Sequence, residues 1–307
     1  MARALLRAVS ALLPTLVFTL TLSAQPRIDN VLERMVPPAS TGLVGAHMDQ
    51  IKQTEIYKKM VAAQSLVQLD QFALETGFDP RRDVRDLLFV TTPQGTVMLA
   101  RGNFHLRSEL LKNVKKTRHG QYDIWGQGGG GFSILDSTLA AAGEIPALEA
   151  ALDEWKSGTH TAAQPLLAHL AAVNPQFELW GISTGAENFL AEHPPAANSG
   201  LDFSRIFSGL QDYWFEADFS AGMRSEVHGT TRTEKDAVNL RDAVRGIVGL
   251  GRLNVPENQP DLLKVWDGIT VDQQGRSVAI HADVTQDLID KMVQMLSGAS
   301  IRPRQIL

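Results

Sequence analysis

The chain has 307 residues, of which 44% are hydrophobic and 21% charged, and its formal net charge is -5. This composition is that of a globular protein and excludes the disordered and fibrous classes. The acidic balance argues against a nucleic-acid partner, because the chain as a whole is not attracted to a phosphate backbone. Cysteine is absent from the sequence, which excludes disulfides, thiolate metal sites and cysteine nucleophiles.

The first 24 residues have the three-part pattern of a secretory signal peptide. Arg3 and Arg7 precede an apolar run that ends in small residues, so cleavage is expected after Ala24. A membrane anchor is the alternative, but the run is shorter than the ~20 apolar residues that span hydrocarbon, and Pro14 interrupts it. We therefore predict a periplasmic or secreted protein with no stable membrane span after signal cleavage. Residues 25–40 are expected to form a linker.

Residues 41–158 are predicted to form a first half of mixed helices and hairpins. Periodicity, turn residues and caps give its expected order: strand 41–49, helices 50–64 and 66–77, a charged turn at 78–84, a hairpin turning at Gln94-Gly95, helix 107–116, a hairpin of strands 121–127 and 132–141 around glycines 128–131, and helix 144–156.

Residues 159–298 are predicted to form a second half after the small and polar boundary 157–165, and the tail 299–307 is expected to be loose. The expected order of this half is again read from periodicity and turns: helix 166–173, strand 177–184, a helix from 185, a short helix 203–210, a hairpin turning at 220–222, a long helix 233–252, a hairpin turning at Gln274-Gly275, and a helix after Thr285.

The two halves repeat the same order of elements. Gly45 falls opposite Gly181, and the turn at Gly95 falls opposite the turn at Gly222. Hairpins are not stable alone in water, so helices must cover one face of each sheet. The sequence therefore predicts an α+β fold of two tandem related halves, each mainly antiparallel hairpins packed against helices.

Three segments resemble uncharacterised exported bacterial proteins that share this layout: PASTGLVGAHMDQIKQTEIYKKM, ETGFDPRRDVRDLLFV and GTVMLARGNF. The resemblance covers most of the chain after the leader. It implies export and the α+β layout, and it implies no activity, cofactor or catalytic position.

Ser183 lies in a G-x-S-x-G sequence, 181–185, between a predicted strand and a predicted helix. This is the pattern of a nucleophile elbow, and His228 or His281 could then act as the base. Asp202, Asp212 or Asp218 would complete a triad. Such a hydrolase also needs alternating strand–helix units before the serine, where we expect hairpins instead. The alternative is a structural strand-to-helix junction.

The hairpin at 211–231 carries a polar stripe on alternate positions. Its members share one face if Phe219 pairs near Met223: Trp214, Glu216, Asp218, Arg224, Glu226 and His228. This register places Asp218 opposite Arg224 and Glu216 opposite Glu226. The stripe is either a binding surface, with room for a cation between its carboxylates and histidine, or a solvated sheet face.

Three further patterns are better explained by structure than by chemistry. Gly126, Gly128 and Gly131 satisfy G-x-G-x-x-G, but a strand rather than a helix is expected after them, which is typical of a hairpin loop. The basic residues of the first half are expected on solvated turns and helices: Arg81, Arg82, Arg85, Lys112, Lys115, Lys116 and Arg118. The histidines are scattered without metal-ligand spacing, so we predict neither a metal nor a cofactor.

Three functions follow from these patterns. The leading hypothesis is a non-enzymatic exported module that binds an envelope protein through one sheet face or the glycine loop. The alternatives are a serine hydrolase with Ser183 as nucleophile and a small-molecule binder with its pocket between the two halves.

Overall fold

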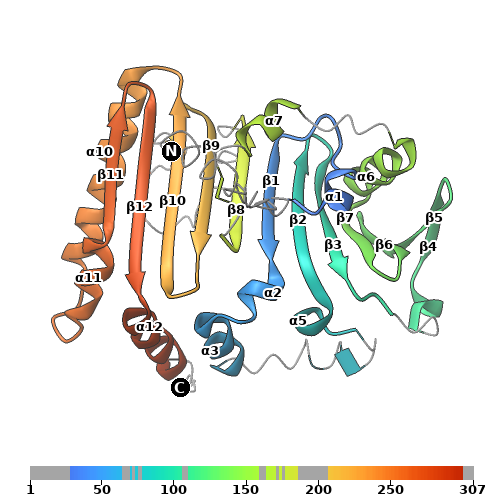
Figure 1. Ribbon diagram of the computed structural model, residues 1–307, viewed down its shortest axis with the longest axis horizontal. Coiled ribbons are helices and arrows are strands. Elements are labelled where there is room, and N and C mark those ends of the chain that lie inside the picture. Colours follow the sequence, from blue (N-terminus) through green and yellow to red (C-terminus); the bar gives the residue numbers. More distant parts are fainter. Residues whose placement is uncertain are drawn as a thin grey trace, which may run out of the picture.

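A single antiparallel sheet of twelve strands organises the molecule, as the computed structural model shows (Figure 1). The structure describes residues 28–63, 70, 73–74, 78–105, 110–158, 164–170, 173–174, 177–185 and 207–299. The strands lie side by side in the order β11-β12-β10-β9-β8-β1-β2-β3-β7-β6-β5-β4. Their bounds are β1 Gly42–His47, β2 Val84–Thr92, β3 Gly95–Gly102, β4 Lys116–His119, β5 Tyr122–Gln127, β6 Gly130–Asp136, β7 Leu139–Glu144, β8 Leu179–Thr184, β9 Leu210–Asp218, β10 Gly222–Thr231, β11 Ile269–Gln274 and β12 Ser277–Thr285.

Helices pack on both faces of the sheet and at the ends of its strands. Their bounds are α1 Asn30–Glu33, α2 Met48–Ile51, α3 Glu55–Ala63, α5 Pro80–Asp83, a 3-10 turn η1 Leu110–Asn113, α6 Ile145–Ser157, α7 Gln164–His169, α10 Glu234–Leu253, α11 Asp261–Asp267 and α12 Gln286–Ala299. Figure 1 shows α10 and α11 at one end of the sheet, α6 toward the other, and α3, α5 and α12 below the strands. The α+β class predicted from the sequence is confirmed, with one large antiparallel sheet that contains strands from both halves of the described chain.

Side chains alternate between two faces of the sheet, which we name the Trp180 face and the Tyr213 face. On the Trp180 face, the first half is closed by α1, α6 and the segment around α7, which bury one continuous apolar core. Leu32, Leu148 and Leu152 from these helices, and Met35 in the turn after α1, are 1% exposed or less. Each such side chain contributes about 1.5–3 kcal/mol by leaving water, so this core anchors the fold.

The Tyr213 face of the second half is closed by α10. This helix begins after Thr233, whose hydroxyl accepts a hydrogen bond from the Asp236 N–H at 3.1 Å, and the cap satisfies a backbone donor that the helix itself cannot pair. Ala237 and Leu240 of α10 are buried against Val271 and Val278 of the sheet. The helix predicted over 233–252 and its cap by Thr233 are confirmed, and of its predicted apolar stripe Ala237 and Leu240 are buried, while Val244, Ile247 and Val248 are half-buried.

Glycine permits close packing at the centre of the sheet, where β1 pairs with β8. A Cβ atom built on Gly45 would lie 2.2 Å from the Trp180 ring, and one on Gly181 would lie 2.2 Å from the Phe215 ring. Both glycines therefore leave room for an aromatic side chain that lies flat over the strand. Gly45 pairs with Trp180 and Val44 pairs with Gly181.

Several predicted elements differ from the structure in kind. The helix expected over 50–64 is two helices, because Thr54 ends one turn and caps the next with its hydroxyl. In the described part of the helix expected over 107–116, residues 110–113 form a 3-10 turn and β4 begins at Lys116, and the charged turn at 78–84 contains the short helix α5. The single strand expected over 132–141 is two strands, since Asp136 accepts the Thr138 N–H at 2.6 Å and turns the chain.

Turn positions also differ slightly from those expected. Thr92 pairs with Gly95, so the two-residue loop is 93–94, and Gly95 at φ 122° opens the return strand. Likewise Gln274 pairs with Ser277, so the last loop is 275–276. The expected helices over 66–77, from 185, and over 203–210 fall largely or wholly outside the described residues, as do the leader and the tail from 300.

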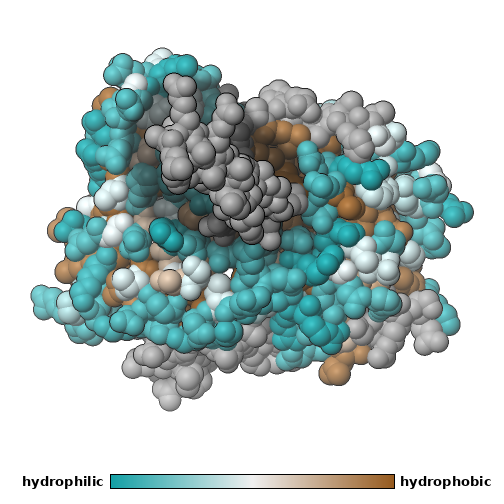
Figure 2. Space-filling model, in the orientation of Figure 1, coloured by the Kyte–Doolittle hydropathy of each residue, from teal (hydrophilic) through white to brown (hydrophobic). Residues whose placement is uncertain are grey.

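The surface seen in Figure 2 is mainly hydrophilic, with smaller hydrophobic areas between the charged side chains. Large exposed hydrophobic residues in the described part include Leu74, Phe89 and, near the end of α10, Leu250 and Leu253. Across the described residues, no helix combines the length and the apolar character that crossing a bilayer requires.

Candidate functional site

The six residues of the predicted polar stripe lie on the Trp180 face of β9 and β10. Asp218 pairs with Arg224, Glu216 with Glu226, and Trp214 with His228. The register predicted from the sequence is therefore confirmed. The neighbouring strand β12 extends the stripe, because Glu226 pairs with His281 and Arg224 pairs with Asp283. We use "polar stripe" below for the six residues together with His281.

Glu226 is the centre of a small hydrogen-bonded cluster. Its Oε1 atom is hydrogen-bonded to His228 Nε2 and lies 3.8 Å from His281 Nδ1. The His228 ring stacks on the Trp214 ring with 4.0 Å between centroids and 14° between planes. The two imidazoles meet edge to face with their centroids 6.0 Å apart. One carboxylate thus orients His228 and lies near His281, and the aromatic ring of Trp214 supports His228.

Asp218 and Arg224 form an ion pair at the turn end of the hairpin, with 2.6 Å between Oδ2 and Nη2. The Ser220 N–H donates to the other carboxylate oxygen at 2.8 Å. Partial burial raises the pKa of Asp218, but the hydrogen bonds from Ser220 and Arg224 outweigh it, and the pKa lies below its usual value. This aspartate is therefore an ionised, oriented acceptor at neutral pH.

Glu216 is the buried member of the stripe, with only 5% of its surface exposed. Burial raises its pKa, the Asn174 N–H that donates to Oε2 at 2.5 Å opposes this, and the nearby charge of Glu226 raises the pKa further. Glu178, also 5% exposed, accepts the Phe219 N–H at 3.0 Å. Two buried carboxyl groups therefore tie β9 to the segments beside it.

The polar row continues into the first half along the same face. His47 Nδ1 lies 3.0 Å from Asp86 Oδ1, and Asp86 pairs with Arg101. Arg101 Nε in turn lies 3.4 Å from Asp29 Oδ2. Sequence reasoning missed His47, Asp86 and Asp283 as members of this row. Alternation along β1, β2 and β12 could have found them only if the order of the strands had been known, because that order joins the two halves.

Ser183 lies on β8 and on the opposite face from the stripe. It pairs with Tyr213, whereas Trp214, His228 and His281 alternate to the other side. The Ser183 hydroxyl donates to the Thr41 carbonyl at 3.3 Å. The residue is buried, with 8% of its surface exposed. Tyr213 is its cross-strand partner, and burial raises the pKa of that phenol, while a hydrogen bond with Ser183 lowers it. The structure does not bring Ser183 together with His228 or His281, as the hydrolase alternative requires. Of the acids considered for the triad, Asp212 lies beside the serine strand, Asp218 lies in the stripe, and Asp202 falls outside the described residues.

The glycine pattern and the basic residues have structural explanations. Gly128 and Gly129 have φ values of 68° and 93° and form the turn between β5 and β6, and no helix follows them. Among the basic residues, several are paired with nearby carboxylates: Arg81 with Asp79, Arg82 with Asp83, and Lys116 and Arg118 with Asp123. These pairs neutralise much of the positive charge predicted for the first half.

The sequence also suggests a ligand pocket between the two halves, but among the described residues the space between β1 and β8 is too small for one. The cavity that touches both β1 and β8 has a volume of about 10 Å³ and is bordered by Gly45, His47, Asp86 and Trp180. This volume holds at most a single water molecule. The indole N–H of Trp180 is buried there without a partner.

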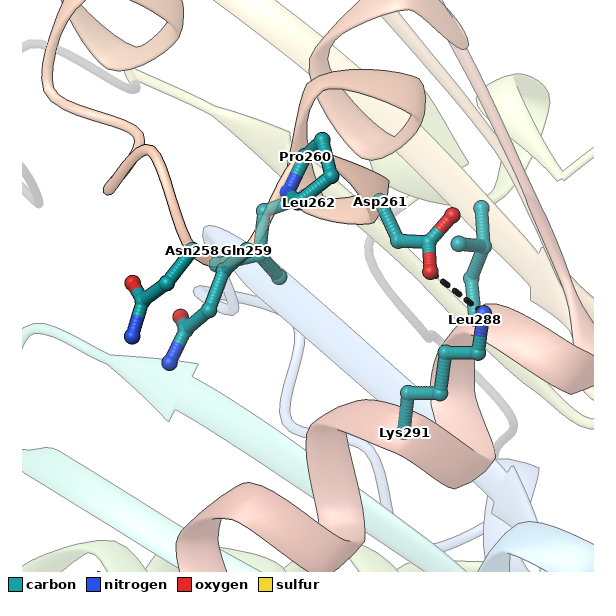
Figure 3. A pocket seen from close by; sticks show the side chains of 7 residues that line it. All are labelled: Asn258, Gln259, Pro260, Asp261, Leu262, Leu288 and Lys291. Carbon is teal, nitrogen blue, oxygen red and sulfur yellow. Dashed lines mark hydrogen bonds and ion pairs between the residues drawn. The ribbon is translucent and has the colours of Figure 1, made fainter.

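A separate shallow pocket lies between α11 and α12, where Lys291 reaches across to Asp261 (Figure 3). Its volume is about 340 Å³, and it opens widely to solvent. Hydrogen bonds from Lys264 and Lys291 lower the pKa of Asp261 to about 2. The lysines and the aspartate are thus already paired, so this pocket presents no unpaired charge to a ligand. Across the described residues, no group of three or more histidine, aspartate or glutamate side chains has the geometry to hold a metal ion.

Solved structures that resemble this chain include crystal forms of TP0453, at a distant level of similarity. Three crystal forms of TP0453 match with TM-scores of 0.49, 0.46 and 0.47 at 8%, 7% and 7% identity. These matches cover 88%, 88% and 86% of this chain and 98%, 97% and 95% of TP0453. No protein-family model matches the chain, and no curated protein matches it. The likeness is too distant to carry an argument about activity or partners.

Proposed function

We propose that this chain is a non-enzymatic exported protein that binds a protein partner of the cell envelope on the polar stripe. The observation that carries the proposal is the assembly of the stripe in register on one face of β9, β10 and β12. Hydrogen bonds orient five of its side chains, Glu216, Asp218, Arg224, Glu226 and His228, which lowers the entropy that a partner must remove on binding.

The charge of the stripe favours a basic partner segment. Glu216, Asp218 and Glu226 contribute carboxyl groups, and Arg224 is the stripe's one guanidinium. Asp218 is matched by Arg224, whereas Glu226 lies beside His228, His281 and the buried Glu216 and has acceptor capacity left. A lysine or arginine of the partner would meet Glu226, with Trp214 and His228 as the aromatic support beside it.

Photo-crosslinking in cells tests this proposal. A photoreactive amino acid replaces Thr270, which is exposed and lies directly opposite His281 on the stripe face. The matched control replaces Leu253, which is 83% exposed on α10. We expect a reproducible protein adduct from position 270 alone, and we expect the adduct to disappear when Glu226→Lys is added. Glu257→Lys, at an exposed position between α10 and α11, should leave it unchanged.

Labelling with a fluorophosphonate probe separates this proposal from a serine hydrolase. The placement of Ser183 and the two histidines on opposite faces supports the non-enzymatic reading. We expect no labelling of the folded protein. Labelling that Ser183→Ala abolishes would replace the binding proposal with a catalytic one.

We also infer that the chain is made of two related halves. The strand order supports this, because β1-β2-β3-β7-β6 on one side of the centre corresponds to β8-β9-β10-β12-β11 on the other. Gly95 and Gly222, with φ values of 122° and 119°, open the corresponding return strands β3 and β10. Between the matching strands, the first half inserts η1, β4 and β5 where the second half inserts α10 and α11.

Export is proposed from the leader-like first 24 residues and from the resemblance to uncharacterised exported bacterial proteins. Fractionation of cells that express the full chain tests it, with the mass of the purified protein measured from each fraction. A periplasmic or secreted product that begins at Gln25 is the expected result. An uncut cytoplasmic chain would refute the proposal.

A further inference from the structure

An apolar cavity lies under the Tyr213 face of the first half, on the opposite face of the sheet from the polar stripe. Its volume is about 540 Å³. This volume, which is partly open to solvent, falls within the ~300–1,000 Å³ of small-molecule sites. The cavity belongs to the first half alone and is separate from the 10 Å³ cavity at the centre of the sheet.

Short side chains on the sheet create the hollow. Ala100 of β3 pairs with Ala140 of β7, and Met98 pairs with Ala142, so three alanines line the floor. The sequence LAAAGE of β7 is thus the local reason for the space, because larger residues at these positions would reach the opposite wall. The walls are apolar and come from η1, β6 and the segments beside them: Phe78, Phe104, Leu111, Val114, Phe132 and Ile134.

Two of the described residues that line the cavity carry polar side chains, Tyr57 and Arg81. Arg81 is already matched, because Nε and Nη2 donate to Asp79 at 2.9 and 2.8 Å and Nη2 lies 2.8 Å from Asp70. Two carboxylates against one guanidinium leave this end of the cavity negative. Within the described residues the Tyr57 hydroxyl has no hydrogen-bond partner, so it can serve a ligand.

We propose that this cavity binds an uncharged lipid-like molecule, a hydrocarbon chain with one hydrogen-bonding oxygen that meets the Tyr57 hydroxyl. The apolar walls take up the chain by removing its surface from water. The negative balance around Arg81 disfavours an anionic head group. This distinguishes the ligand from a fatty acid of the same length, which is ionised at neutral pH.

Fluorescence titration of the purified protein with Nile red, a neutral apolar dye, tests the cavity, and displacement by tetradecanol tests the ligand class. We expect tetradecanol to displace the dye and tetradecanoate to compete more weakly. Ala140→Phe fills the floor and should weaken binding of the dye by about tenfold or more. The matched control is Ala282→Phe, the same change on the Tyr213 face of β12, outside the cavity, which should leave the affinity unchanged.

Tyr57→Phe tests the polar contact while keeping the ring in the wall. We expect tetradecanol to bind about three- to tenfold more weakly and Nile red to bind as before, since one hydrogen bond is lost. If tetradecanol bound Tyr57→Phe and the natural protein with equal affinity, the Tyr57 hydroxyl would not be the group that meets the ligand oxygen. Stronger binding of tetradecanoate than of tetradecanol would overturn the preference for an uncharged head group.

Because a variant can fail to fold, the proposal is also tested on the unmodified protein. Tetradecanol carrying a photoreactive group on its chain is crosslinked, and the labelled peptides are identified by mass spectrometry. Adducts on Phe104, Phe132 or Ile134 are the expected result. Adducts confined to the second half would overturn the proposal even if the dye affinities agreed with it.

Discussion

Gly45 lies on β1 where this strand pairs with β8, and its lack of a side chain leaves room for Trp180 of β8. Trp180 lies across it, and a Cβ atom at this position would approach the indole ring to 2.2 Å. Gly45→Ala must therefore displace either Trp180 or strand β1 at the centre of the sheet. We expect a loss of about 1–3 kcal/mol in the free energy of unfolding, as for other overpacked cores.

The measurement is equilibrium unfolding in urea, followed by tryptophan fluorescence. Gly246→Ala serves as the control, because a Cβ there meets no other atom within 4 Å and the position lies inside α10. That change should stabilise the protein by roughly 0.5–1 kcal/mol, since alanine favours the helix. A Gly45→Ala protein as stable as the control would mean that Trp180 does not lie over this glycine.

The raised pKa of Glu216 leads us to expect that the stability of the protein depends on pH. Its pKa in the folded state is raised above the usual 4.5, chiefly by burial. The folded chain therefore holds this proton more tightly than the unfolded chain does. The stability that the protonated group contributes is complete below 4.5 and is lost as the pH rises through the folded pKa. Glu216→Gln keeps an acceptor for the Asn174 N–H and cannot ionise.

We expect Glu216→Gln to be more stable than the natural protein at neutral pH, with the difference vanishing in acid. Urea midpoints measured from pH 4 to pH 8 check this. Asp272→Asn, at an exposed position on β11, is the control and should show no such convergence. A difference that grows toward low pH would contradict the assigned direction of the pKa shift.

Among the elements, α10 is the one whose sequence most fully specifies its structure. Its first turn is capped by Thr233, which also donates to Asp236 Oδ2 at 2.7 Å. Thr233→Ala removes both contacts and should cost about 1 kcal/mol of stability. The measurement is thermal unfolding by circular dichroism. Lys235→Ala, at an exposed position in the first turn of α10, is the control and should change the melting temperature little.

The elements predicted from the sequence are those whose signals are local. Helix 233–252 has a cap and a regular apolar stripe, and the hairpin 211–231 alternates strictly, so both were predicted with nearly the observed bounds. The sequence predicts one strand over 132–141, where the structure has β6 and β7. The signal for the turn between them is local, because aspartate followed by serine and threonine favours a turn at Asp136. The register of the polar stripe was predictable, but its neighbours His281 and Asp283 depend on which strand lies beside β10.

At the scale of the whole molecule, the two halves meet at the β1–β8 strand pair, in the shared apolar core on the Trp180 face, and where α3 lies against α12. β1 pairs with β8 over residues 42–46 and 179–183, and the Thr184 N–H adds a bond to the Thr41 carbonyl at 2.7 Å. Because both halves contribute side chains to this core and strands to this pair, a chain cut within 159–163 should keep its structure. We expect separately expressed halves to associate when mixed and to recover the circular dichroism spectrum of the intact chain.

Size-exclusion chromatography of the mixed halves checks this, and Gly45→Ala in the first half is the control that should weaken the association. Halves that remain apart, each with a native-like spectrum, would show that β1 and β8 contribute little. Halves that aggregate alone but associate when mixed would show that the centre of the sheet is part of both cores.

The two ends of the sheet have a consequence for how the protein behaves among copies of itself. An open sheet ends in unpaired backbone groups, which can recruit further strands from other molecules. Here one border strand, β4, has only four residues and exposes Lys116 and Arg118. At the other border, Arg245 of α10 donates to the Val271 carbonyl of β11 at 2.6 Å. Short length, like charges and a side chain bound to the backbone make both borders poor templates, so the sheet resists growth into fibrils.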